Sequence, residues 1–292
     1  MDGVIVINKP TGQTSHNLVG FTRRLLNIKK VGHTGTLDPD ASGVLPVCIG
    51  RGTKAADMLT ASDKAYRAQF ILGMTTDTLD ASGEILTEQP VNVTKEQIED
   101  VIKGFIGEIF QIPPMFSAIK KDGKKLYELA REGITIEREK RKVTIFDIKI
   151  CELDMQNYAI TIEVFCSKGT YIRTLCEDIG MKLGCGAYMN TLVRIKSANF
   201  TLEESYTPEE LLKMKENGTI EKVIIPVDKL FLDYDKVVLD EFLTGKAKNV
   251  IAIRKKCLED GNIYRIYGYD GEFLCISEYR DGALYLKKAF WN

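Results

Sequence analysis

The sequence has almost no net charge and very few histidines. Its 292 residues carry 40 lysines and arginines against 41 aspartates and glutamates, a formal charge of −1. A strongly basic total is missing, so any binding of nucleic acid must depend on local clusters. The two histidines, His16 and His33, belong to different predicted elements, which argues against a histidine-based metal site. We therefore expect no bound metal.

Cysteine pairs and long apolar segments are also missing. The seven cysteines show no C-x-x-C spacing and no neighbouring histidine, so we expect reduced core residues and no zinc site. The amino-terminal stretch MDGVIVINKP contains only a short apolar run, which is neither a signal peptide nor a membrane span. We therefore expect a cytoplasmic protein with no membrane partner.

What the sequence does contain is the patterning of an α+β fold. Strands are expected at residues 4–8, 43–50, 64–73, 141–153 and 158–169. The last two are joined by a polar turn and predict a hairpin. Helices are expected to start at Ser15, Thr94 and Thr207, each of which is a residue type that favours the N-cap. Helices interleaved with hairpin-linked strands favour a mostly antiparallel central sheet.

The pattern changes after about Asp233. Short strands follow, separated by the glycine-containing turns EDGN, YDGE and RDGA. This spacing is typical of a small all-β module. The sequence therefore predicts two domains, 1–231 and 232–292.

The stretch GHTGTLDPDASGVLP, residues 32–46, is the first candidate site. Its glycines and Asp-Pro dipeptide are typical of a structural turn. Its position between a predicted helix and a buried strand is also one where loops carry functional groups. Composition alone favours the structural turn and gives Asp38 no catalytic role, and His33 is equally compatible with a structural or a functional role.

A second candidate is the basic segment 117–142, which also contains several glutamates. Alternating charge of this kind is compatible with a solvated helix and loop. The other interpretation is contact with phosphates, because four lysines flank the turn at Gly123 and suit an arm that follows a polyanion. These lysines are Lys120, Lys121, Lys124 and Lys125.

The segment SKGTYIRTLCEDIG places Tyr171 and Arg173 two residues apart at the end of a predicted strand. If the chain is still extended there, both side chains point to the same side. An arginine in this position can partner a buried carboxylate and keep it ionised.

Several segments in order resemble the TruB family of bacterial tRNA pseudouridine-55 synthases. They are INKPTGQTS, VGHTGTLDPDASGVLPVCIGRGTK, DKAYRAQFILGMTTDTLDASGEI, IPPMFSAIKKDGKKLYELAREGI, CSKGTYIRTLCEDIGMKLGCGA and LVRIKSANF. The resemblance covers residues 4–230. The stretch YRIYGYDGEFLCISEYRDGALYLKKAF is similar to a PUA domain, a small RNA-binding pseudobarrel.

The resemblance implies a fold, an activity and a partner. The fold would be a mixed, mainly antiparallel sheet flanked by helices and loops, with residues 117–142 as a thumb that closes on RNA. The activity would be isomerisation of uridine 55 in the T-loop of tRNA to pseudouridine, without a cofactor. The partner would be the T-arm stem-loop of tRNA. No long apolar heptad argues for assembly, so we expect a monomer.

The resemblance also implies roles for individual residues. Asp38 would be the nucleophile, Arg173 its ion-pair partner and Tyr66 the ring that stacks on the base. The other implied substrate-binding residues are His33 in the gap left by the flipped nucleotide, Tyr171 and Leu192 in the pocket, Lys9 with Pro10 in its floor, and Lys120, Lys121, Lys124 and Lys125 in the thumb. We assign no chemistry to Asp40.

Some alternatives stay open at this point. An ionised aspartate can attack carbon 6 of the base or the anomeric carbon of the sugar, and the sequence does not choose between them. The same fold could act on a guide-selected uridine or on another uridine of tRNA. A non-catalytic RNA-binding or tRNA-folding protein, with Asp38 only a turn residue, is the alternative from another class.

Overall fold

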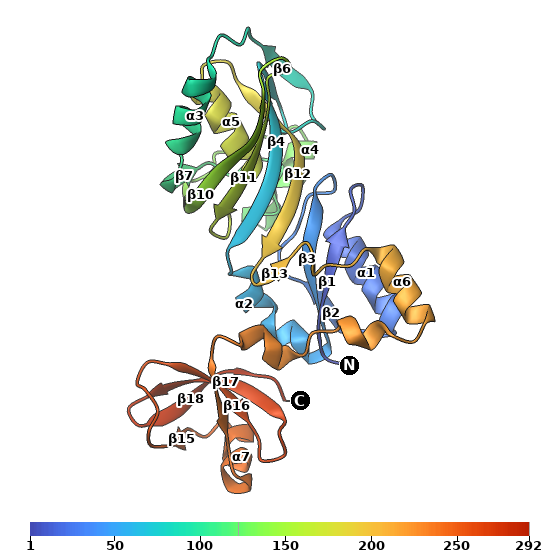
Figure 1. Ribbon diagram of the computed structural model, residues 1–292, viewed down its shortest axis with the longest axis vertical. Coiled ribbons are helices and arrows are strands. Elements are labelled where there is room, and N and C mark those ends of the chain that lie inside the picture. Colours follow the sequence, from blue (N-terminus) through green and yellow to red (C-terminus); the bar gives the residue numbers. More distant parts are fainter. Residues whose placement is uncertain (122, 292) are drawn as a thin grey trace.

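The computed structural model describes residues 1–121 and 123–291 and contains two main sheets (Figure 1). Among these residues, the larger sheet has nine strands. Its main path runs through β1 (Gly3–Lys9), β3 (Ser42–Ile49), β12 (Ala187–Ser197), β4 (Lys64–Leu72), β11 (Ala159–Cys166), β10 (Arg141–Asp154) and β7 (Gly107–Gln111). Two further strands, β2 (Val31–His33) and β13 (Phe200–Thr201), pair with β3 and β12.

The larger sheet is mixed but mainly antiparallel, as predicted. Neighbouring strands pair antiparallel except β3 and β12, which run parallel where Arg194 lies opposite Gly43. The predicted hairpin is the β10–β11 pair. The prediction of an α+β fold with a mixed, mainly antiparallel central sheet is therefore confirmed.

Helices cover one face of this sheet (Figure 1). On β4, β11 and β10 lie α3 (Lys95–Lys103) and α5 (Ile172–Lys182), and beside β1 lie α1 (Ser15–Leu26) and α6 (Pro208–Glu216). Both predicted capping boxes are present, at Thr94 and Thr207. The largest apolar core packs α3 and α5 against the sheet through residues such as Ile98, Phe70 and Ile179.

The start of α1 differs from the prediction. Thr14, not Ser15, is its N-cap, because the Thr14 hydroxyl accepts the backbone N–H of Asn17. The Ser15 hydroxyl is turned toward the 34–41 loop instead, where it accepts from Leu37 N at 2.9 Å and donates to Leu37 O. This pair of bonds ties the beginning of α1 to the loop that carries Asp38.

Short elements connect the strands. They are η1 (Gly50–Ala55), α2 (Ala56–Thr60), β5 (Met74–Thr76), β6 (Ile85–Glu88), β8 (Lys120–Lys121), β9 (Lys124–Lys125), α4 (Leu126–Arg131), η2 (Ile220–Val223) and η3 (Val227–Phe231). Strand β5 pairs with β6, and β8 pairs with β9.

The second sheet lies in the carboxyl-terminal part and curls around its own core. Its order is β14 (Asp235–Val238), β16 (Ile263–Tyr267), β17 (Phe273–Arg280), β18 (Ala283–Ala289) and β15 (Ile253–Arg254), and α7 (Glu241–Lys248) follows β14. The glycines of the three predicted turns, Gly261, Gly271 and Gly282, have positive φ. This half-barrel is consistent with a PUA-like module; Asn292 of the predicted module lies outside the described residues.

The carboxyl-terminal sheet packs on the larger body through an apolar cluster. Phe231 lies 5.6 Å from Phe290 between ring centroids, and Ala55 and Ile276 belong to the same cluster. Lys288 on β18 also pairs with Asp57 on α2 at 2.7 Å. Removing the module would therefore expose an apolar surface on the body that remains.

The structure bears on the predictions about cysteines and about membrane spans. Five cysteines are buried, but Cys151 and Cys257 are exposed, so the prediction that all seven are core residues is wrong for these two. Cys151 lies within the register shift between Ile150 and Glu152 of β10, where it has no partner on β11. None of the helices in the described residues combines the length and the apolar character that a membrane span requires.

Candidate active site

Asp38 stands in the loop between β2 and β3, beside a pocket of about 270 Å³. The other residues that line this pocket are Asp40, Ala41, Asp80, Ala81, Ser82, Met189, Asn190 and Leu192. The Asp38 side chain is 44% exposed, so its carboxylate is accessible from the pocket. The structure therefore brings two predicted residues, Asp38 and Leu192, to one cavity.

Arg173 forms the predicted ion pair with Asp38. Its Nη2 lies 3.2 Å from Asp38 Oδ2, and its side chain is only 6% exposed. The same guanidinium contacts Asp80 Oδ2 at 3.2 Å through Nη1. A buried arginine is thus shared by two carboxylates, and both of these aspartates line the pocket.

The backbone at Arg173 is helical and not extended, although we considered an extended chain from the sequence. Strand β11 ends at Cys166, and Tyr171 is the extended N-cap residue of α5, so Arg173 already lies in the first helical turn. Gln111 fixes this start because its side chain bonds both Tyr171 N and Tyr171 O. The helix therefore aims the arginine at the loop of Asp38, and an extended chain is not needed.

Burial and the neighbouring charges determine whether Asp38 is ionised. Burial raises the pKa of Asp38, and the Arg173 guanidinium is the main influence that opposes the rise. Asp80 and Asp40 raise the pKa further, because a like charge disfavours ionisation. Arg173 is therefore the strongest of the groups that favour an ionised Asp38, and Lys9 is the next.

Asp80 is the site residue that sequence reasoning missed. It lies in the 77–84 loop, where Oδ1 accepts from the hydroxyls of Thr78 and Ser82. The sequence contains only a weak signal for it, since an aspartate before a serine and a glycine is typical of any turn. Its partnership with Arg173 spans 93 positions and follows from the tertiary fold.

Lys9 donates hydrogen bonds to the loop that carries Asp38. It is completely buried, and its Nζ donates to the carbonyl oxygens of Pro10, Pro39 and Ala41 at 2.9, 2.9 and 2.6 Å. Two of these carbonyls belong to Pro39 and Ala41, which follow Asp38 closely in the chain. Burial lowers the pKa of Lys9 to about 8, and the charges of Asp40 and Asp38 act against that change.

Tyr66 and Tyr171 approach the same site from different elements. Tyr66 lies on β4 and packs against the core beneath α5. Burial raises the pKa of Tyr171, and the charge of Asp38 adds to the rise. Burial also raises the pKa of Tyr66, and the charge of Asp38 adds to that rise too. Neither ring lines the pocket of Asp38 in the described residues.

His33 ends β2 and belongs to a different element from the other histidine. His16 is in α1, as the sequence predicted. Burial lowers the pKa of His33, with Arg194 as the next influence, so the imidazole favours its neutral form. Within the described part of the chain, its buried Nδ1 has no hydrogen-bond partner, and no group of three or more His, Cys, Asp or Glu residues is arranged to hold a metal.

The thumb lysines stand on the β8–β9 hairpin. Lys120 lies opposite Lys125 and Lys121 opposite Lys124, while Asp122 of the predicted thumb lies outside the described residues. None of the four lysines lines the pocket of Asp38. The contact with the site comes from the residue just before the thumb, because Arg173 Nη2 donates to Phe116 O at 2.8 Å.

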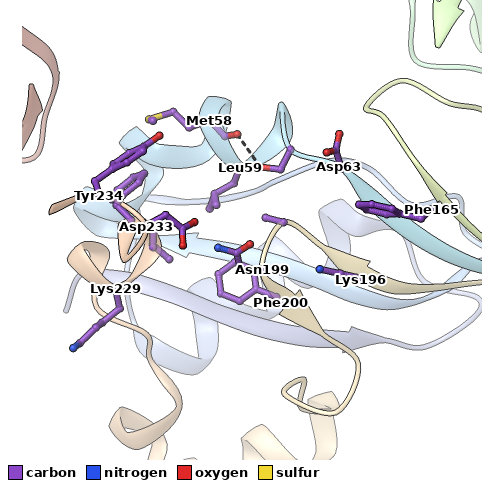
Figure 2. A pocket seen from close by; sticks show the side chains of 14 residues that line it. Met58, Leu59, Asp63, Phe165, Lys196, Asn199, Phe200, Lys229, Asp233 and Tyr234 are labelled. Atoms are coloured by element: carbon purple, nitrogen blue, oxygen red, sulfur yellow. Dashed lines mark hydrogen bonds between the residues drawn. The ribbon is translucent and has the colours of Figure 1, made fainter. Parts of the chain in front are cut away.

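Figure 2 shows a larger pocket, of about 390 Å³, elsewhere in the molecule. Phe165, Lys196 and Tyr234 lie on its walls, between the larger sheet and the segment that leads to the carboxyl-terminal module. None of the predicted site residues lines it, so it is not the candidate active site.

Comparisons with known proteins agree with the predicted family and fold. Residues 23–172 match the model of the TruB family pseudouridylate synthase (N terminal domain), and residues 173–232 match the tRNA pseudouridylate synthase B C-terminal domain. A tRNA pseudouridine synthase B from Clostridium kluyveri is 44% identical over 99% of this chain and 100% of the relative. One from Geobacillus thermodenitrificans is 42% identical over 98% of this chain and 95% of the relative.

Solved structures give the same result. A Cbf5-Nop10-Gar1 complex contains a chain that matches with a TM-score of 0.75 and 28% identity, covering 99% of this chain and 85% of that one. An H/ACA RNP bound to a substrate RNA containing 2′-deoxyuridine matches with a TM-score of 0.74 and 26% identity over 99% of this chain and 85% of that one. Fold and matches together define a pseudouridine synthase, which is an isomerase. Within that class, the chain belongs to the TruB family.

Proposed function

We propose that this enzyme isomerises uridine 55 in the T-loop of tRNA to pseudouridine, with Asp38 as the nucleophile and no cofactor. The observation that carries the proposal is the Asp38–Arg173 ion pair at the mouth of a pocket. The carboxylate attacks carbon 6 of the base or the anomeric carbon of the sugar, the glycosidic bond breaks, and the sugar rejoins at carbon 5. The bond to Asp38 breaks again, the proton on carbon 5 leaves to water, and nitrogen 1 of the base takes up a proton from water, so nothing is added or removed overall.

The target uridine has to leave its stack before Asp38 can reach it. Unstacking costs roughly a few kcal/mol, and contact of one base with an aromatic ring returns about 1 to 3 kcal/mol. Tyr66 stacks on the flipped base, and Tyr171 and Leu192 line its surroundings. His33, which is partly buried and favours the neutral form, fills the gap in the RNA.

The names of the relatives support tRNA as the substrate. The T-arm stem-loop as the bound element, a monomeric enzyme and a cytoplasmic location remain our predictions. We also propose residues 1–231 as the catalytic domain and 232–292 as a PUA-like module that adds RNA contact. Because the module covers Ala55 and Phe231, its contribution has to be separated from its effect on stability.

The function is tested with a T-arm transcript that carries tritium at carbon 5 of its uridines. We expect the wild-type enzyme to release one tritium per transcript, because only uridine 55 exchanges that hydrogen. A matched transcript with cytidine at position 55 should release none. Release from the cytidine transcript would point to another uridine, and no release from either would rule out the proposed reaction.

The thumb lysines predict a salt dependence. Changing Lys120, Lys121, Lys124 and Lys125 together to glutamine should lower the slope of log affinity against log salt by about 3, since each lost phosphate contact removes roughly 0.7 to 0.9. Lys124 already pairs with Glu132 at 3.7 Å, so it should contribute least of the four. The measurement is filter binding of the T-arm transcript between about 50 and 200 mM salt. An unchanged slope would remove the thumb from RNA binding.

Lys9 predicts a fall in turnover at basic pH. Below its pKa of about 8, the ammonium group has three hydrogens for three carbonyl oxygens. Above that pH the neutral amine has only two, so one carbonyl loses its donor and the loop of Asp38 loosens. Turnover should therefore decrease as the pH rises through about 8, and Lys9→Met should be slower but free of this decrease. A Lys9→Met profile with the same decrease would contradict the assignment.

A further inference from the structure

Arg194 is a buried charged residue to which the mechanism above gives no role. Only 1% of its surface is exposed, and no ion pair of the described residues includes it. Burying a guanidinium without a carboxylate is costly, so other polar groups must compensate for it. Its partners show what it is placed to do.

Two of these partners are carbonyl oxygens on either side of Asp38. Arg194 Nε donates to Val44 O at 2.7 Å, and Nη2 donates to Gly35 O at 3.2 Å. The backbone is tied to the same loop, because Arg194 pairs with Gly43 where β12 meets β3. A Cβ on Gly43 would lie 2.3 Å from Arg194 O, so glycine is required for this approach. The guanidinium therefore has a fixed orientation relative to the loop.

Tyr66 is a further neighbour of Arg194. In the antiparallel pair of β12 and β4, Arg194 lies directly opposite Tyr66, and directly opposite side chains share one face of a sheet. Burial raises the pKa of Tyr66, and the adjacent Arg194 is the strongest influence against the rise. The register therefore places the guanidinium and the phenol on the same face of neighbouring strands, and a phenol oxygen can accept a hydrogen bond from a guanidinium.

We propose that Arg194 is a positioning residue of the active site: the loop carbonyls orient its guanidinium, which holds the Tyr66 hydroxyl and thereby sets the ring against the base that Asp38 attacks. Arg194 itself touches neither base nor sugar. The inference rests on the proposed function, since it concerns the geometry of that reaction. Small displacements at a reacting centre can cost about 100-fold in rate, so a side chain behind the ring can matter this much.

A double-mutant cycle tests the link between the two residues. Single-turnover tritium release at saturating T-arm RNA is measured for the wild type, Arg194→Met, Tyr66→Phe and the double variant. Arg194→Met should slow release about 10- to 100-fold when Tyr66 is present and less than about 3-fold when Tyr66→Phe has removed the hydroxyl. Equal losses in both backgrounds would overturn the inference.

Lys64→Met is the matched control. Lys64 is another buried cation on β4, and it donates only to the carbonyls of Thr60 and Ser62. The effect of Lys64→Met on the rate of tritium release should add to the effect of Tyr66→Phe. If Arg194→Met does not fold, as judged by circular dichroism, Arg194→Lys replaces it in the cycle because it keeps the charge but not the planar fork.

A second readout does not depend on turnover. In protein labelled with 3-fluorotyrosine, the fluorine resonance that Tyr66→Phe removes should move in Arg194→Met or Arg194→Lys and stay in place in Lys64→Met. A wild type that releases no tritium overturns the proposed function whatever this resonance does. A resonance that stays in place overturns the role of Arg194 whatever the turnover.

Discussion

Arg173→Met is expected to lower the rate of pseudouridine formation by about 10³-fold, with RNA affinity changed only a few-fold. Removing one partner of a buried ion pair costs about 3 to 5 kcal/mol, because the remaining charge is left without compensation. Here two carboxylates lose their partner, since Arg173 contacts both Asp38 and Asp80 at 3.2 Å. The measurement is single-turnover product formation with saturating T-arm RNA.

The same variant should shift the pH dependence in a defined direction. Arg173 is the main group that opposes the raised pKa of Asp38, whereas Asp80 and Asp40 raise it. Without the guanidinium the pKa of Asp38 rises further, so the loss of activity on acidification should begin at a higher pH than in the wild type. Arg173→Lys, which keeps the charge, should shift the profile less while remaining slow. An unshifted profile in Arg173→Met would contradict the electrostatic role.

The residues that sequence reasoning placed correctly are those with local signals. The capping boxes at Thr94 and Thr207 mark helix starts through bonds within three residues, and the hairpin of β10 and β11 follows from strand patterning. Asp38, the proposed nucleophile, has no such local signal. Composition left Asp38 as a turn residue, and only the resemblance, followed by the contact with Arg173, gives its carboxylate a partner.

The features that sequence reasoning missed depend on contacts between distant segments. Asp80 reaches Arg173 across 93 positions, and no local pattern encodes that distance. Ser15 looks like an N-cap in sequence, but its hydroxyl is taken by Leu37 while Thr14 caps the helix. Arg194 belongs to a strand pattern that gives no hint of its carbonyl partners. These are the contacts that shape the site.

Asp38→Asn should lower pseudouridine formation by at least about 10⁴-fold, the largest effect that we expect from one substitution. An amide is not a nucleophile, so the covalent step is lost while shape and volume are kept. Arg173 still has Asp80 as its partner, so the site should not collapse. RNA affinity should stay within a few-fold of the wild type.

The stability of this variant has an expected sign as well. Because the folded pKa of Asp38 lies above its ordinary value, the folded state holds that proton more tightly than the unfolded chain, and ionisation at neutral pH costs stability. Asp38→Asn should therefore unfold at the same temperature as the wild type or at a higher one. Asp40→Asn, the same change two residues along, is the matched control and should slow turnover by less than about 10-fold.

The most direct test of the account is tritium release from a T-arm transcript labelled at carbon 5 of uridine, with the wild-type enzyme and Asp38→Asn side by side at saturating RNA. The account predicts release of one tritium per transcript by the wild type and none above background by Asp38→Asn, although both bind the RNA. Release by Asp38→Asn at a rate near that of the wild type would contradict the assignment of Asp38 as the nucleophile.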